Sequence, residues 1–161
     1  MRVIAIDPGY DRCGIAILEG SSGSETIVFS ECFQTRKEES LAQRIFSIGE
    51  RINQLISKYK PQSMAVEDLF FAKNTKTALD VSQARGVIVF QGMRNNLRIY
   101  EYTPNQIKLA VTGYGSATKK DMHFLTSKLI KLEDKTYIDD EIDAIAVGIT
   151  CLASYTLQDK S

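Results

Sequence analysis

Four acidic residues fall where the chain could bring their side chains together. Asp7 and Glu67 each end a short apolar run that is typical of a buried strand. Asp140 and Asp143 are three residues apart at the start of the last predicted helix, so their side chains project from one face. Crowded carboxylates are costly unless cations neutralise them, and these four therefore predict a site for divalent metal ions.

Oxygen-only ligation narrows the chemistry that such a site could perform. Carboxylates suit Mg²⁺ or Mn²⁺, and two such ions about 3.5–4 Å apart are the usual arrangement for in-line cleavage of a phosphodiester bond. One ion would activate the attacking water, and the other would stabilise the departing 3′ oxygen. The single histidine, His123, and three widely spaced cysteines argue against a zinc site. We expect two Mg²⁺ ions in the site, with Mn²⁺ able to substitute.

Two neighbouring acids compete for the role of ligand. Strand alternation points Asp68 to the opposite face from Glu67, which makes Asp68 the weaker candidate. Asp139 is the better candidate for the helix N-cap, which leaves Asp140 for the metal. Acids in a first helical turn are also favoured by the helix dipole alone, so the choice between Asp139 and Asp140 stays open.

The charge of the chain is zero overall but unevenly distributed. Residues 69–132 carry ten Lys or Arg against three acids, a net of +7, and the remainder carries a net of −7. A basic surface beside an acidic cluster suits a nucleic-acid backbone beside metal ions. The alternative is that solvated helix faces merely differ in sign.

Hydrophobic periodicity places the elements that must position these residues. Three antiparallel strands come first, then helices alternate with two further strands, and helices complete the chain. Ser40, Thr103 and Thr118 each have the character of a helix N-cap. We expect strands at 3–7, 13–18, 26–33, 63–67 and 98–102. We expect helices from about 41 to a point before Pro61, from about 75 to 95, from 104, from 119, and from 139 to about 155.

This order predicts an α/β protein with a mixed five-stranded sheet, three strands antiparallel and then two parallel, and helices on both faces. That is the layout of ribonuclease H-like folds. Residues 1–161 show no interdomain linker and fit a single domain. Without a signal-like start or a long apolar run, and with an odd number of scattered cysteines, the sequence favours a cytoplasmic protein with reduced thiols and no membrane contact.

Five segments, in order along the chain, resemble the RuvC family of Holliday-junction endonucleases. They are Ile6-Asp7-Pro8-Gly9 with Gly14-Ile15-Ala16; Val66-Glu67 with Phe70-Phe71-Ala72-Lys73-Asn74; Ser82-Gln83-Ala84-Arg85-Gly86-Val87; Tyr114-Gly115-Ser116-Ala117 with Lys119; and Asp140-Glu141-Ile142-Asp143-Ala144. The resemblance covers almost the whole chain.

The resemblance implies roles for individual residues. It assigns metal ligation to the four acids named first. It implies that Phe70 probes the junction centre by stacking on an unpaired base. Lys108 and Lys119 match family positions that contact DNA near the cleaved phosphate, and we count Lys119 among the catalytic residues as well. Lys73 and Arg85 are further candidates for DNA contact.

The resemblance also implies an activity and partners. A homodimer would resolve four-way junction DNA by paired symmetric nicks in recombination and repair, and a two-fold dimer suits a two-fold substrate. A branch-migration motor of the RuvA–RuvB type is a possible further partner.

Three alternatives remain for the sequence alone. A YqgF-type nuclease of ribosomal RNA maturation has a similar opening strand, but the phenylalanine motif after Glu67 favours RuvC. An actin- or hexokinase-like phosphotransferase would need a longer chain. A junction-binding module without cleavage would not need the intact acids. The dense acidic run at 139–141 and the neutral net charge both depart from the expected family pattern.

Overall fold

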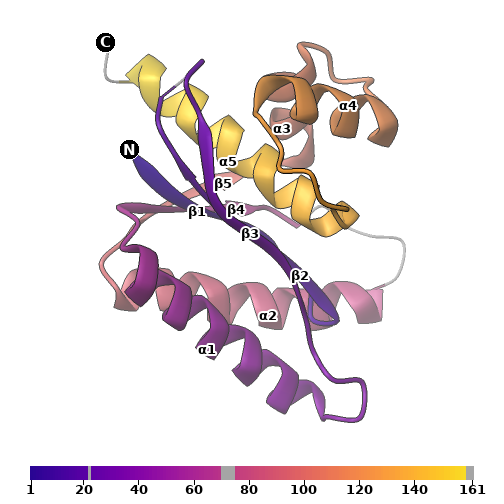
Figure 1. Cartoon of the computed structure of the whole chain (residues 1–161). Helices are drawn as coiled ribbons and strands as arrows, with labels where there is room; N and C mark the ends of the chain where they lie inside the picture. The colour runs from indigo at the N-terminus through magenta and orange to yellow at the C-terminus, as the bar shows by residue number, and fades with distance from the viewer. Residues whose placement is uncertain (22, 70–74, 159–161) are drawn as a thin grey trace.

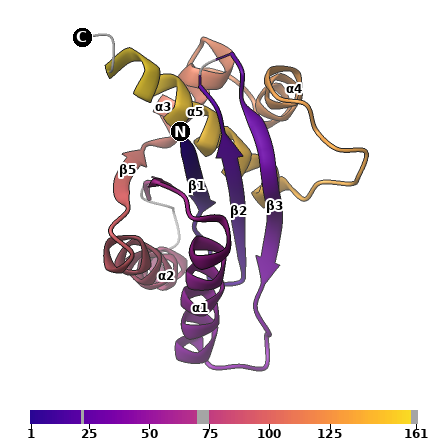
Figure 2. The same ribbon diagram turned by 60° about the vertical axis from the view of Figure 1, so that its left-hand side comes forward.

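The computed structural model describes residues 1–21, 23–69 and 75–158. Its five-stranded sheet has the order β3-β2-β1-β4-β5. β1 (Arg2–Asp7), β2 (Arg12–Glu19) and β3 (Thr26–Gln34) are antiparallel neighbours, and β4 (Ser63–Glu67) and β5 (Arg98–Tyr102) run parallel to β1. Figure 2 shows β1, β2 and β3 side by side, with β5 beyond β1. The predicted ribonuclease H-like sheet is confirmed.

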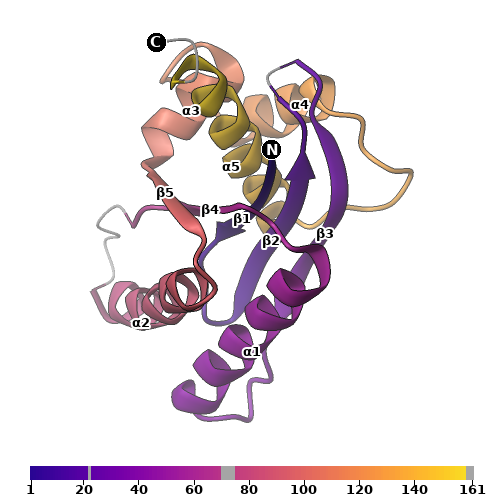
Figure 3. The ribbon, with the colours of Figure 1, turned by 90° about the vertical axis from the view of Figure 1, so that its left-hand side faces the viewer.

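Helices cover both faces of this sheet. α1 (Leu41–Tyr59) and α2 (Thr75–Arg94) lie on one face, and α5 (Asp139–Gln158) lies on the other (Figures 1 and 3). α3 (Pro104–Thr112) and α4 (Lys119–Leu129) pack beyond α5 on its face of the sheet. The start of α5 and the end of β1 lie at the same end of the molecule, which is where the predicted acids lie.

Alternation along β1 divides the core into two layers. Residues 3–6 are fully buried, as expected for the central strand. Ile4 and Ile6 face the α1–α2 layer, whereas Val3 and Ala5 face α5. A Cβ on Gly148 would lie 2.8 Å from a methyl group of Leu18, so α5 can lie this close to the sheet only because residue 148 has no side chain.

Side-chain caps define where three helices begin. Ser40, Thr103 and Thr118 each accept a hydrogen bond from the backbone N–H three residues on, and the side chain at that position accepts one from the cap N–H. These caps are the residues that the sequence predicts. α1 ends at Lys60, which adopts the left-handed conformation just before Pro61.

The first turn of α5 differs from the prediction. The helix begins at Asp139, and the carbonyl of Ile138 accepts the first helical hydrogen bond, from Ile142 N–H. Asp139 is therefore inside the helix, and the prediction that it is the N-cap is wrong. Within the described part of the chain, no helix is long and apolar enough to cross a membrane.

Candidate active site

Two strand ends bring the first pair of acids together. Asp7 and Glu67 are the last residues of β1 and β4, which are parallel neighbours with Ile6 opposite Val66. Parallel strands in this register end at one edge of the sheet. The two carboxylates therefore emerge side by side there, as the sequence predicts.

A missing side chain on β2 brings α5 to the same edge. Gly14 pairs with Asp7, and a Cβ on Gly14 would lie 1.8 Å from the backbone carbonyl oxygen of Asp140. No other residue type would let the first turn of α5 sit directly on the strand. Asp140 and Asp143 therefore approach Asp7 from above the sheet.

Charge crowding is evident in how these acids titrate. Burial, followed by the charges of Glu67, Asp143 and Asp140, raises the pKa of Asp7 well above its ordinary value. Burial and the charge of Asp143 raise the pKa of Glu67 to about 7. Burial also raises the pKa of Asp143, although the charges of Lys119 and His123 oppose it. Without added positive charge, the carboxyl of Glu67 therefore keeps its proton to a higher pH than a free glutamate does.

The residues of this cluster fit hard divalent cations. They offer oxygen ligands only, and Asp140 Oδ2 is buried without a hydrogen-bond donor in the described structure. The Arg12 guanidinium lies 3.3 Å from that oxygen, but not in hydrogen-bonding geometry. Among the described residues, no three His, Cys, Asp or Glu side chains already stand close enough to hold a metal ion.

Three successive acids at the start of α5 have three different environments. The carboxylate of Asp139 faces α4 and lies 3.1 Å from Lys119 Nζ, and this hydrogen bond lowers the pKa of Asp139. Asp140 faces the acid cluster. Glu141 is only 4% exposed and points to the sheet, where it accepts hydrogen bonds from Ser30 Oγ at 2.5 Å and from Lys135 Nζ at 2.7 Å. Because neighbouring helical side chains diverge, Asp140 is the one of these three acids whose charge raises the pKa of Asp7.

Two lysines stand beside the acids, as predicted. An open cavity of about 220 Å³ is lined by Glu67, Pro104, Ile107, Lys108, Lys119, Met122, Asp143 and Ala146. Burial lowers the pKa of Lys119, but its hydrogen bond to Asp139 and the charge of Asp143 outweigh that effect and leave the pKa raised. Lys119 is therefore a permanent cation at the rim of the cluster.

The other predicted DNA contacts are placed differently. Arg85 on α2 forms ion pairs with Asp68, at 3.3 Å, and with Glu101, so its charge is shared with acids at the ends of β4 and β5. This pairing also takes Asp68 away from the cluster, in agreement with the sequence interpretation. Phe70 and Lys73 lie outside the described residues.

Sequence reasoning missed three residues of the site. His123 lies on α4 with its Nε2 3.6 Å from Asp143, and its position four residues after Lys119 could have revealed a shared helix face. Arg12 and Glu141 gave no such signal, because their partners come from other elements.

A mixed sheet of this order, with helices on both faces and acids at the ends of β1 and β4 and at the start of α5, is the architecture of a ribonuclease H-like nuclease. The family model "Crossover junction endodeoxyribonuclease RuvC" matches residues 3–151. The chain belongs to this family. That membership decides against the YqgF-type and phosphotransferase alternatives.

Individual relatives agree with the assignment. The RuvC proteins of Petrotoga mobilis and Natranaerobius thermophilus are 44% and 38% identical to the chain, over 92% and 99% of it and 91% and 99% of their own lengths. The structure of Thermus thermophilus RuvC in complex with a Holliday junction superposes with a TM-score of 0.92 at 24% identity, covering 98% of this chain and 96% of that one. The fowlpox virus resolvase, with a TM-score of 0.61 at 16% identity over 93% and 97%, shares the fold.

Proposed function

We propose that this protein is a structure-selective endonuclease that resolves Holliday junctions by paired symmetric nicks, in homologous recombination and DNA repair. The observation that carries the proposal is one cavity in which acids from β4 and α5 face Lys108 and Lys119. Carboxylates beside fixed cations are what a phosphodiester needs at the point of cleavage.

Asp7, Glu67, Asp140 and Asp143 are the proposed metal ligands. Two Mg²⁺ ions, replaceable by Mn²⁺, would supply an activated water and stabilise the leaving oxygen. The four carboxylates hold their ions only when deprotonated, so the raised pKa values couple ion binding to proton release.

The lysines act on the DNA itself. Lys119, held by Asp139, and Lys108, from α3, would bind the non-bridging oxygens next to the cleaved bond and orient the phosphate toward the acids. Phe70 at the junction centre and Lys73 and Arg85 on the DNA backbone remain proposals that rest on the family resemblance.

An apolar stripe on α2 supports a homodimer. Leu79, Phe90 and Met93 are each more than half exposed, and a Cβ on Gly86 between them would meet nothing within 4 Å. Phe46 on the neighbouring helix α1 is also more than half exposed. Contiguous exposed apolar side chains mark association surfaces. Two subunits joined here would present two active sites to a two-fold junction.

Further proposals follow from the family. Residues 1–161 would form one domain that acts in the cytoplasm, with a RuvA–RuvB-type motor as a partner. None of the described residues identifies that motor's docking surface.

Cleavage of a synthetic four-way junction in Mg²⁺ tests the central proposal. We expect symmetric nicks from the wild type and none from Asp7→Asn, which should still bind the junction. Equal cutting of plain duplex or of RNA, or cleavage in excess chelator, would contradict it. Junction binding with no cleavage by the wild type would instead identify a non-catalytic binding module.

A further inference from the structure

A second pocket, away from the lysine-lined cavity, opens beside the acid cluster. It has a volume of about 420 Å³ and is lined by Asp11, Arg12, Gln34, Thr35 and Lys37. These residues come from the β1–β2 turn, the end of β3 and the connection to α1. We propose that this pocket binds a backbone phosphate of the cleaved DNA strand, close to the phosphate at which that strand is cut. The inference rests on the proposed function. It adds a contact with the cleaved strand to those proposed for Lys108 and Lys119.

The walls of the pocket are held rigidly. Thr35 N–H donates to the carbonyl of Asp11 at 3.0 Å, and Thr35 Oγ1 donates to the carbonyl of Tyr10 at 2.7 Å. The buried Arg44 donates through Nε to Thr35 Oγ1 at 2.8 Å and lies over the Tyr10 ring. These bonds join the β1–β2 turn to the start of α1, so a ligand would meet a preformed surface.

The charge of the pocket favours an anion. Arg44 forms an ion pair with Asp11, which neutralises the one acid in the lining. The side chain of Arg12 is 54% exposed and shares its charge with Asp140 at 3.3 Å, which leaves Lys37 as the exposed cation of the lining. Lys37 makes no ion pair within the described residues. Gln34 adds a neutral amide that can donate a hydrogen bond to a phosphate oxygen.

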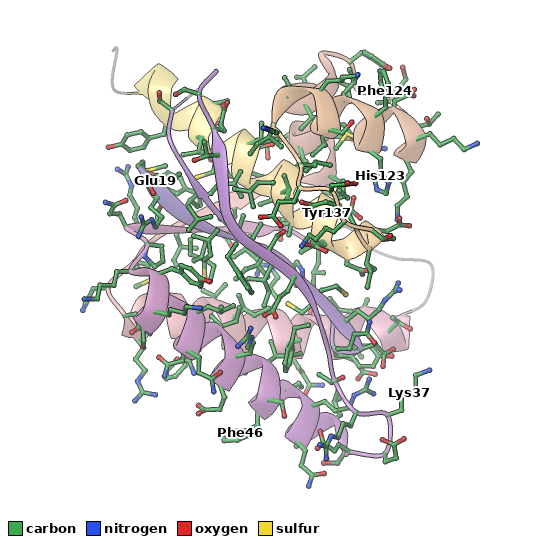
Figure 4. The ribbon with its side chains drawn as sticks, in the orientation of Figure 1. Glu19, Lys37, Phe46, His123, Phe124 and Tyr137 are labelled. Atoms are coloured by element: carbon green, nitrogen blue, oxygen red, sulfur yellow. The ribbon has the colours of Figure 1, made fainter. Side chains whose placement is uncertain are left out.

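The position of the pocket identifies the anion as DNA. Arg12 lines the pocket and also lies 3.3 Å from Asp140, so the pocket borders directly on the acid cluster. Figure 4 shows Lys37 on the same side of the molecule as His123, which contacts Asp143. The cavity that contains Lys108 and Lys119 includes Glu67 and Asp143 in its lining, whereas the pocket that contains Lys37 adjoins the cluster through the contact between Arg12 and Asp140. A strand cleaved at the acids would thus be held by cations from both.

The salt dependence of junction binding tests this site. Measurements use the Asp7→Asn protein, so that cleavage does not interfere. Each phosphate that a protein neutralises contributes about 0.9 to the slope of log K against log salt concentration for B-DNA. Lys37→Ala should therefore reduce the magnitude of the slope by about that amount, whereas Lys37→Arg should leave the slope unchanged. Lys58→Ala is the matched control, since Lys58 lies in the last turn of α1, at the far end of a helix roughly 28 Å long.

A chemical substitution identifies the phosphate. Methylphosphonate linkages, which carry no charge, are placed one at a time on either side of the cut. In the Asp7→Asn protein, a methylphosphonate at one of these linkages should reduce the salt slope as much as Lys37→Ala does. In the protein that also carries Lys37→Ala, the same linkage should cause no further reduction. A slope for Lys37→Ala equal to that of Lys58→Ala would overturn the pocket assignment. Failure of Asp7→Asn itself to bind the junction would instead refute the proposed function.

Discussion

The backbone carbonyl oxygen of Asp140 lies over Gly14 so closely that a Cβ there would come within 1.8 Å of it. Gly14 is also the partner of Asp7 in the sheet, so one contact sets the distance between β1 and the acids of α5. The site therefore depends on a residue that carries no functional group.

Replacing this glycine should separate the acids. In Gly14→Ala the first turn of α5 must move away, at a cost of about 1–3 kcal/mol in the free energy of unfolding, and cleavage should be lost even where the protein remains folded. Urea unfolding and junction cleavage measure the two effects. Gly115→Ala, where a Cβ meets nothing within 4 Å, is the control for stability. Full cleavage by Gly14→Ala would show that the close approach is not needed.

The choice between Asp139 and Asp140 can be tested directly. Asp140→Asn should abolish cleavage, because it removes a proposed ligand. Asp139→Asn should reduce cleavage less than about fivefold, since an exposed ion pair such as that of Asp139 with Lys119 contributes little. Single-turnover rates at saturating Mg²⁺ measure both. The reverse ranking would make Asp139 the ligand.

Glu141 should act by holding the helix in place. Glu141→Ala leaves Ser30 and Lys135 without their shared carboxylate, which should cost about 1–3 kcal/mol of stability and also slow cleavage. Glu31→Ala is a matched control, because Glu31 follows Ser30 on β3 but pairs with Arg51 of α1 at 2.7 Å. We expect the control to lose stability without slower cleavage of the folded fraction. Equal rates for the two variants would contradict a positioning role.

The protein without metal should become less stable as pH rises from about 4.5 to about 7. In that interval the folded state keeps a proton on Glu67 that the unfolded state has lost, so unfolding is favoured by increasing pH. The loss in the free energy of unfolding that is due to Glu67 is on the order of 2–3 kcal/mol. The loss is complete once the pH exceeds the pKa of Glu67 in the folded protein, and it should be absent in Glu67→Gln. Urea unfolding in chelator across this pH range measures it. A stability that increases over the interval would contradict the raised pKa.

The stripe on α2 should hold the dimer together. Phe90→Lys places a charge in the middle of the stripe and should convert a dimer into monomers of 18.0 kDa in sedimentation equilibrium. Phe124→Lys, an equally exposed position on α4, should leave the dimer intact. A wild type that sediments as a monomer at micromolar concentration would refute this interface.

The sequence by itself determined the elements and the outline of the site. Alternation and apolar runs located all five strands, and the caps Ser40, Thr103 and Thr118 placed three helix starts, because these signals depend on local backbone geometry. Asp7 and Glu67 could each be placed at a strand end in advance, although only the structure makes those two strands parallel neighbours. Periodicity likewise placed Asp140 and Asp143 on one helix face.

Only the tertiary structure decided which way that face points. Periodicity gives the angles between Asp139, Asp140 and Glu141 but not the rotation of α5 about its axis, which depends on Gly14, Gly148 and the buried bond from Ser30 to Glu141. The roles of Arg12 and Glu141, which contact Asp140 and Ser30, were hidden for the same reason. Their partners lie far away in sequence, and contacts of that kind exist only once the sheet and both helix layers have packed.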